Sequence, residues 1–168
     1  GNLMSTLIEH FALLARYNRA ANERLLAACS RLSLEALRSE SAAPFGSVFG
    51  LLEHVLAADE VWLARFNGDL GAQLRKGPHQ GLDLAEFMTL RTVMDERITA
   101  FAAALTVEDL DRPMSYLNSS GVRIEGPMSR LLAHMFNHQT HHRGQVQVLL
   151  REAGVMGVVL DLHRLTAT

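Results

Sequence analysis

Apolar residues recur at helical spacing along four long segments of the chain. The first segment is expected to form a helix from about Ser5, a good N-cap residue, to about Ser30. Its apolar stripe comprises Leu7, Phe11, Leu14, Ala15, Leu25 and Ala28. A second helix is expected over residues 48–66, with Ser47 as its N-cap and one stripe made of Leu51, Val55, Ala58 and Trp62.

The middle of the chain adds a loop and a third helix. The stretch 67–81 is interrupted by Gly68, Gly71, Gly77, Pro78 and Gly81, which is typical of a surface loop. A third helix is predicted over residues 84–105, and its inward positions are expected to be Phe87, Leu90, Met94, Ile98, Phe101 and Leu105.

The pattern then changes before a fourth helix begins. A capped turn is expected over residues 106–111, where Thr106 faces Asp109 three residues later. Short runs at 114–117 and 122–125 flank a polar tetrapeptide that ends in Gly121, which predicts a hairpin. Pro127 suits the first turn of a helix that reaches about Ala153 and stops at Gly154. The tail, 155–168, is expected to pack back on the helices.

Four amphipathic helices joined by short links must bury their apolar stripes against one another. The pattern therefore predicts an all-α four-helix bundle with a short hairpin excursion between the third and fourth helices. A length of 168 residues fits a single domain over residues 1–168.

Composition and charge argue against several classes of partner. A net charge of −2, without a run of Lys or Arg, gives no electrostatic basis for binding nucleic acid. The chain has no apolar run of 18 residues, so we expect no membrane span, and the N-terminus lacks the pattern of a signal peptide. One cysteine, Cys29, excludes an intramolecular disulfide and suits a reducing, cytoplasmic location. Cys29 lacks the charge pattern of an activated thiol, which favours a structural role.

Histidines are the unusual feature of the composition. The chain has eight, and four of them lie between His134 and His142. At about 100° per residue, His138 and His142 fall within about 20° of the apolar direction set by Leu131 and therefore point inward. His134 and His141 lie about 60–80° away from that direction and flank the interior. Two imidazoles one helical turn apart can converge on one metal ion.

A third ligand has to come from another helix. His54 is the best candidate, because it lies beside the apolar stripe of the second helix. Three neutral imidazoles would leave one side of an ion open to water or a substrate. The alternative is a set of buried, hydrogen-bonded histidines, and the residues alone favour neither reading over the other. A zinc protease is a poor match, since Gln139 stands where an HExxH motif requires glutamate.

Three segments resemble a known family. The segment NHQTHHRGQ at 137–145, preceded by His134, resembles the signature of the DinB/YfiT-like metalloenzymes, the DinB family. ARYNRAANERLL at 15–26 and FGSVFGLLEHVLAADEVWLARF at 45–66 resemble the first and second helices of that family. With the loop and hairpin, the resemblance covers nearly the whole chain.

The resemblance implies an up-down-down-up four-helix bundle, often a homodimer, with a nickel- or zinc-type divalent ion on three histidines. Carried over by position, the ligands are His54, His138 and His142. Some members are transferases or isomerases that use low-molecular-weight thiols such as bacillithiol, mycothiol or glutathione. The resemblance therefore favours a thiol-dependent S-transferase acting on a small-molecule substrate. The alternatives are a hydrolase with metal-activated water, a non-catalytic metal- or ligand-binding dimer, and a plain helical interaction module.

Further polar residues are candidates for the pocket. Asn18 and Asn22, one turn apart, could contact a substrate, and an ordinary polar helix flank is an equal alternative. His134 could line the pocket or hydrogen-bond behind the metal, or lie on the helix flank. Arg143 is expected to form a surface salt bridge rather than to bind an anionic substrate.

Two acidic residues and one further histidine complete the set. Asp59 and Glu60 follow His54 closely enough in the sequence to be candidates for hydrogen bonds behind the metal ligands. A place on a solvated helix face is the favoured interpretation for both. His141 is expected to hydrogen-bond outward, to another helix or to backbone.

Overall fold

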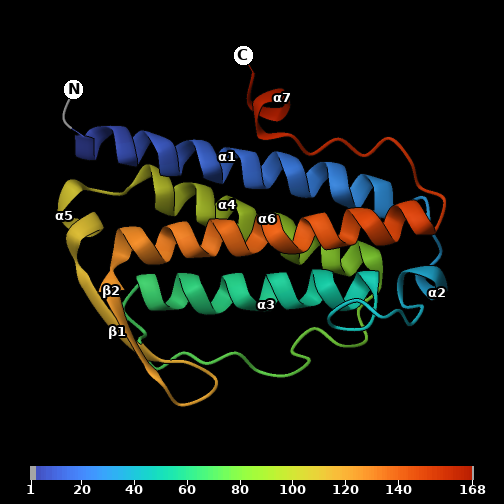
Figure 1. The fold of residues 1–168 in the computed structure, drawn as a ribbon, viewed down its shortest axis with the longest axis horizontal. Helices are drawn as coiled ribbons and strands as arrows, with labels where there is room; N and C mark the ends of the chain where they lie inside the picture. Colours follow the sequence, from blue (N-terminus) through green and yellow to red (C-terminus); the bar gives the residue numbers. More distant parts are fainter. Residues whose placement is uncertain (1–2, 168) are drawn as a thin grey trace.

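The computed structural model describes residues 3–167, and most of them are helical. The four long helices are α1 (Leu3–Cys29), α3 (Val48–Phe66), α4 (Leu84–Ala103) and α6 (Met128–Glu152). They lie side by side, α1 against α4 and α6, and α3 against α6 and α4 (Figure 1). The colour gradient along the ribbon runs in one direction in α1 and α6 and in the opposite direction in α3 and α4.

Short elements connect the long helices. They are α2 (Leu34–Leu37), α5 (Val107–Asp111), α7 (Leu162–Thr166) and an antiparallel pair of strands, β1 (Pro113–Leu117) and β2 (Arg123–Pro127). The pair confirms the predicted hairpin, and its register places Tyr116 opposite Ile124. Asn118 holds the turn, because its side-chain oxygen accepts hydrogen bonds from the backbone N–H groups of Ser120 and Val122.

Side-chain caps explain where several helices begin. The Ser47 hydroxyl accepts a hydrogen bond from the Gly50 N–H at 2.9 Å, which confirms the predicted start of α3. Asp83 with Glu86 forms a capping box at the start of α4, and Thr106 with Asp109 forms one at α5.

Three details of the predicted helices were wrong. The first helix already includes Leu3, so Ser5 lies inside α1 and is not its N-cap. The third helix ends at Ala103, two residues early, because the chain must turn before Thr106 caps α5. Leu90, expected to point inward, is 39% exposed on α4.

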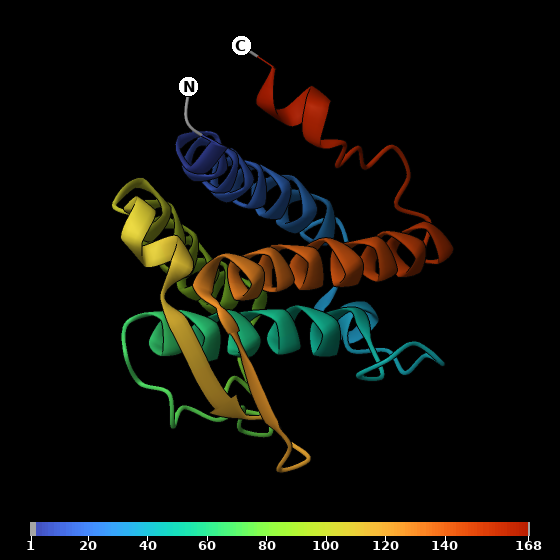
Figure 2. The same ribbon diagram turned by 60° about the vertical axis from the view of Figure 1, so that its left-hand side comes forward.

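The core is aliphatic with a few aromatic rings. Phe11, Phe49, Phe66 and Phe87 are the largest rings that are almost fully buried. The described part of the tail packs back as predicted, because Leu160 is buried and its carbonyl accepts a 2.7 Å hydrogen bond from the Tyr17 hydroxyl. Figure 2 shows this tail returning along α1 to α7; Thr168 lies outside the described residues.

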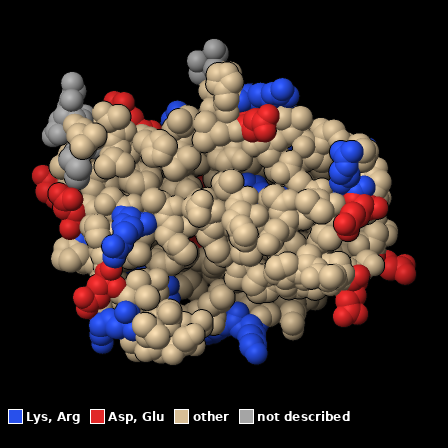
Figure 3. All heavy atoms as spheres, in the orientation of Figure 1, with Lys and Arg blue, Asp and Glu red and all other residues tan. Residues whose placement is uncertain are grey.

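The surface shows no large single-sign region on the face drawn in Figure 3. Acidic and basic side chains alternate around its edge, and its centre carries few of either. None of the helices within residues 3–167 is both long enough and apolar enough to cross a membrane.

Candidate metal centre

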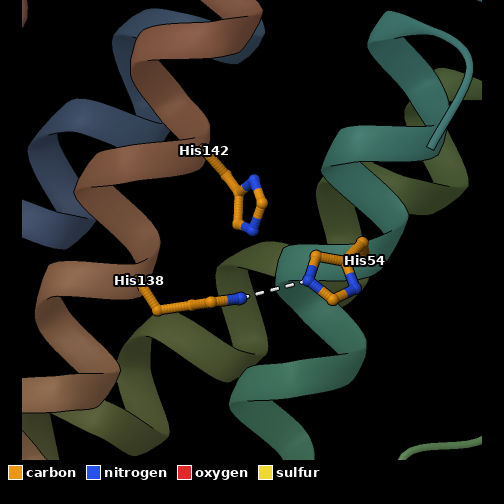
Figure 4. A group of neighbouring side chains, drawn as sticks. All are labelled: His54, His138 and His142. Carbon is orange, nitrogen blue, oxygen red and sulfur yellow. Dashed lines mark hydrogen bonds between the residues drawn. The ribbon is translucent and has the colours of Figure 1, made fainter. Parts of the chain in front are cut away.

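Three histidines from two helices converge on one point of the structure. His54 comes from the middle of α3, and His138 and His142 come from α6. One ring nitrogen of each lies within 4.8 Å of the other two, and Nε2 of His54 is 3.0 Å from Nε2 of His138 (Figure 4). The structure therefore brings together the three residues that the sequence nominated as metal ligands.

Helix geometry explains this convergence. His138 and His142 are one turn apart on α6, so their rings lie on the same face of the helix, edge to face, with centroids 4.5 Å apart. The packing of α3 against α6 places His54 edge-on to both, with centroids 5.0 Å from His138 and 4.8 Å from His142. His142 is 7% exposed, whereas His54 and His138 are half-buried. The cluster thus lies where the interior of the bundle meets the surface.

The environment keeps the three imidazoles neutral. Burial, with the nearby His142, lowers the pKa of His54 to about 4. Burial, with the neighbouring histidines, lowers the pKa of His138 to about 3, and burial also lowers the pKa of His142. At neutral pH each ring therefore carries a lone pair rather than a second proton, which is the form that binds a metal ion.

Gln145 orients one of the three rings. Its side-chain Oε1 lies 2.7 Å from Nδ1 of His142 and accepts the proton of that nitrogen. The contact leaves Nε2 of His142 as the nitrogen with a free lone pair. This role of Gln145 was not predicted from the sequence, although its spacing of three residues from His142 on one helix could have indicated it.

These observations fit a divalent ion held by imidazole. Tetrahedral ions with metal–nitrogen bonds of about 2.0–2.1 Å hold neighbouring nitrogens about 3.3 Å apart. The 3.0 Å separation of His54 and His138 is close to that value. Nδ1 of His138 is buried with no hydrogen-bond partner among the described residues, so no described protein group fixes the tautomer of this ring.

Aromatic side chains border the cluster on two sides. Phe45 stacks on His54 with centroids 3.8 Å apart. On the other side, the ring of His134 lies 6.2 Å from that of His138 and contacts Trp62, which in turn contacts Tyr116 of β1. His134 is exposed, and partial burial of its ring lowers its pKa. His134 therefore stands beside the cluster as a neutral, solvent-accessible base.

Asn18 and Asn22 lie in the core and not on a solvated flank. They are 0% and 5% exposed, and their amide groups donate to the carboxylate of Asp95 on α4 at 2.8–3.1 Å. Their side-chain oxygens accept hydrogen bonds from Arg143 at 2.7 and 3.3 Å. Asn22 also lines a small, mainly apolar cavity that reaches His142. A substrate contact by either asparagine stays a prediction.

The expected surface salt bridge of Arg143 was wrong. Arg143 is 3% exposed, and its guanidinium lies over the ring of Tyr17 as well as against the two asparagines. Burial lowers the pKa of Arg143, and the nearby Asp59 opposes this effect.

Asp59 is also not on a solvated face. It is 0% exposed, accepts a 2.7 Å hydrogen bond from Arg91, and accepts one of 2.9 Å from Gln139, the neighbour of His138 in the chain. Arg91 pairs with Asp95 as well, at 2.8 Å. The buried polar residues thus link all four long helices around the cluster and fix α6 relative to α3.

The remaining candidates lie outside the cluster. Glu60 pairs with His79 in the loop before α4, at 3.0 Å. His141 is exposed and contacts Gln145 of its own helix, not another helix. Cys29 is fully buried, and burial raises its pKa to about 12, in line with the structural role expected from the sequence.

Comparison with known proteins places this arrangement in a family. Residues 4–167 match the model of the DinB family. The chain is 29% identical to Protein DinB of Bacillus subtilis over 155 residues, covering 88% of each chain. It is 27% identical to the YrdA protein of the same organism over 153 residues, covering 90% of this chain and 86% of YrdA.

Solved structures show the same fold. A DinB-like protein from Bacillus subtilis matches with a TM-score of 0.62 at 19% identity, over 92% of this chain and 96% of its own. A DinB-like protein from Bacillus cereus matches with a TM-score of 0.56 at 25% identity, over 83% and 91%. With the family model matching nearly the whole described chain, the protein belongs to the DinB family.

Proposed function

We propose that the protein is a metal-dependent enzyme that binds one divalent ion through His54, His138 and His142 and joins the sulfur of an intact small thiol to an electrophilic carbon. The thiol proton passes to a base, and a leaving group departs from that carbon or an epoxide ring opens. The observation that carries the proposal is the convergence of three neutral imidazoles, from two packed helices, with ring nitrogens within 4.8 Å of one another. Because His54 and His138 are only half-buried, an ion in that position would be within reach of solvent and of a reacting ligand.

Side chains of the protein would bind the ion, orient one of its ligands and accept the proton of the thiol. His54 and His138 approach from opposite helices, and Gln145 holds the His142 ring with Nε2 toward the cluster. A bound divalent ion supplies charge that lowers the pKa of a coordinated thiol and favours its thiolate. His134, neutral and exposed beside His138, is suited to accept the proton that the thiol loses.

The finer features of this proposal follow the family resemblance. Imidazole ligands suit nickel and zinc, and glutathione is one low-molecular-weight thiol that would serve as co-substrate. The proposal includes an up-down-down-up arrangement of the four long helices, which the opposed directions of α1 and α6 against α3 and α4 support. It also includes a homodimer acting in the cytoplasm on a small molecule.

A screen with reconstituted protein tests the proposal. Protein free of chelator and of a His-tag is loaded with nickel or zinc and assayed with thiols against halides and epoxides. We expect turnover in the wild type and its loss in His138→Ala, whereas His163→Ala, which removes an exposed histidine on α7, retains it.

Other results would select the alternatives or reject the site. Turnover of esters or amides without a thiol would favour a metal-dependent hydrolase. A tightly held ion with a large loss of thermal stability in His138→Ala, but no turnover, would favour a non-catalytic metal-binding dimer. If the wild type binds no ion at equal concentrations of protein and metal, the metal-dependent function is wrong and a plain helical interaction module is favoured.

A further inference from the structure

Phe45 covers one face of a proposed metal ligand while its own outer face stays open to solvent. Its ring is 13° from parallel to that of His54, and the centroids are 3.8 Å apart. The same ring meets His142 edge-on at 5.7 Å. Because Phe45 is 53% exposed although one face is covered, the opposite face is available for contact. An apolar surface therefore adjoins two of the three histidines.

The backbone at Phe45 is one that bulky residues avoid. Its φ is +62°, and it is the only described residue other than glycine with a positive φ. Glycine or asparagine adopts this left-handed conformation far more readily than phenylalanine. Strain of this kind concentrates at ligand-binding sites, where the surrounding structure enforces it.

Gly50, in the first turn of α3, makes the placement of Phe45 possible. A Cβ on Gly50 would clash with the carbonyl oxygen of Phe45, so only a residue without a side chain lets the loop lie this close to the helix. Gly46, with a φ of +78°, then returns the chain to the N-cap at Ser47. The loop thus holds the ring of Phe45 beside the histidine cluster. The backbone there has a conformation that favours glycine or asparagine, and the ring exposes apolar surface.

We propose that Phe45 is a binding surface for an aromatic or flat apolar group of the molecule that occupies the open side of the metal ion. The proposal rests on the proposed metal site and adds the chemical class of its ligand: a donor atom, such as a thiol sulfur, one or two bonds from an aromatic ring. Rings stack well on an exposed phenyl face, and such contacts favour the bound ligand beyond simple burial. A purely structural role would not require the strained backbone or the exposed face.

The test compares two thiols on cobalt-loaded protein. Benzyl mercaptan and ethanethiol are titrated separately, and the thiolate–cobalt absorption band reports binding of each. Phe45→Asn removes the ring and suits the left-handed backbone, and Phe45→Trp retains an aromatic surface. Val122→Asn is the control, because Val122 is 55% exposed in the hairpin turn and its loss removes a similar exposed apolar side chain elsewhere.

We expect Phe45→Asn to lower the affinity for benzyl mercaptan by about two- to tenfold relative to the affinity for ethanethiol. Phe45→Trp and Val122→Asn are expected to keep the wild-type ratio of the two affinities. Phe45→Asn is also expected to unfold at the same or a higher temperature than the wild type, because the strain is relieved. An equal loss for both thiols, or an unchanged preference, would overturn the proposal.

Two further outcomes separate this inference from the function on which it rests. If cobalt itself fails to bind the wild type, the metal site is wrong, and this inference fails with it. If cobalt binds normally but Phe45→Asn converts a dimer to a monomer in sedimentation without changing the thiol preference, Phe45 contacts a second copy of the chain and not a ligand.

Discussion

Truncation of Gln145 to alanine is expected to weaken binding of the divalent ion by about 10- to 100-fold. Gln145 is the only described hydrogen-bond partner of Nδ1 of His142, at 2.7 Å, and that contact sets which ring nitrogen bears the proton. Without it the neutral imidazole exchanges between two tautomers and rotates about its terminal torsion. The ion must then select the one orientation in which Nε2 faces His54 and His138.

The magnitude follows from the interactions that are lost. Equal population of two tautomers accounts for about twofold in affinity, since only one of them presents a lone pair on Nε2. Restricting the freed ring costs on the order of 0.5–1 kcal/mol more. The hydrogen bond to Gln145 also strengthens when the imidazole binds the ion through its other nitrogen, because hydrogen bonds to charged groups contribute about 1.5–3 kcal/mol. The tautomer effect is about 0.4 kcal/mol, and the gain of the hydrogen bond over a neutral one is about 1 kcal/mol. With the cost of restricting the ring, the loss is about 2 kcal/mol, which lies inside the stated range.

Competition with a chromophoric chelator at neutral pH measures this effect. Gln145→Glu keeps an oxygen acceptor at the same position, so its affinity is expected to stay close to or above that of the wild type. His141→Ala removes the other hydrogen-bond partner of Gln145, at 3.3 Å, and serves as the matched control with little change. If Gln145→Ala binds the ion within about twofold of the wild type, Gln145 does not orient His142 as described.

Three further predictions concern stability and reactivity. Asp59→Ala leaves Arg91 buried with one carboxylate fewer and is expected to lower the free energy of unfolding by about 3–5 kcal/mol in urea titrations; a loss below about 1 kcal/mol would contradict the buried pair. Burial lowers the pKa values of His54 and His138 to about 4 and about 3, from the usual 6.5 of histidine. The unfolded chain therefore takes up protons first, and the stability of the metal-free protein falls as pH drops from about 6.5 toward 4. The fall in the free energy of unfolding with decreasing pH should be smaller in His138→Ala than in the wild type. An equal fall in both proteins would refute the lowered pKa of His138. Cys29, buried with a pKa raised to about 12, should react with a thiol reagent only at the rate of unfolding, and rapid labelling of the native protein would count against its burial.

The helices could be predicted because their signals are local. Ser47 before an apolar stripe fixes the start of α3, and Gly154 with a φ of +88° follows the end of α6. Local signals also explain the errors. Ser5 is a residue type typical of an N-cap, but the helix begins before it, and Leu90 fits the apolar period although its side chain is 39% exposed.

The histidine cluster was predictable in part for the same reason. His138 and His142 share one face through the spacing of four residues on a single helix. His54 required only that two amphipathic helices pack against each other. Phe45 was missed because its position depends on the left-handed turn and on contact with Gly50, neither of which follows from hydrophobic periodicity.

Burial of the charged residues could not be read from the sequence. Asp59 and Arg143 look like ordinary surface positions, and each is buried because its partners come from other helices, up to 125 residues away in the chain. Pairing of this kind offsets the cost of burying a charge only when all partners are in place. Neither residue alone therefore signals its environment.

Anomalous diffraction from crystals of the protein loaded with zinc would show which side chains bind the ion. We expect one anomalous peak at about 2.0–2.1 Å from a ring nitrogen of each of His54, His138 and His142, with at least one further position open to solvent. An ion bound elsewhere, or a fully loaded crystal in which the ring of His54 does not contact the ion, would contradict it.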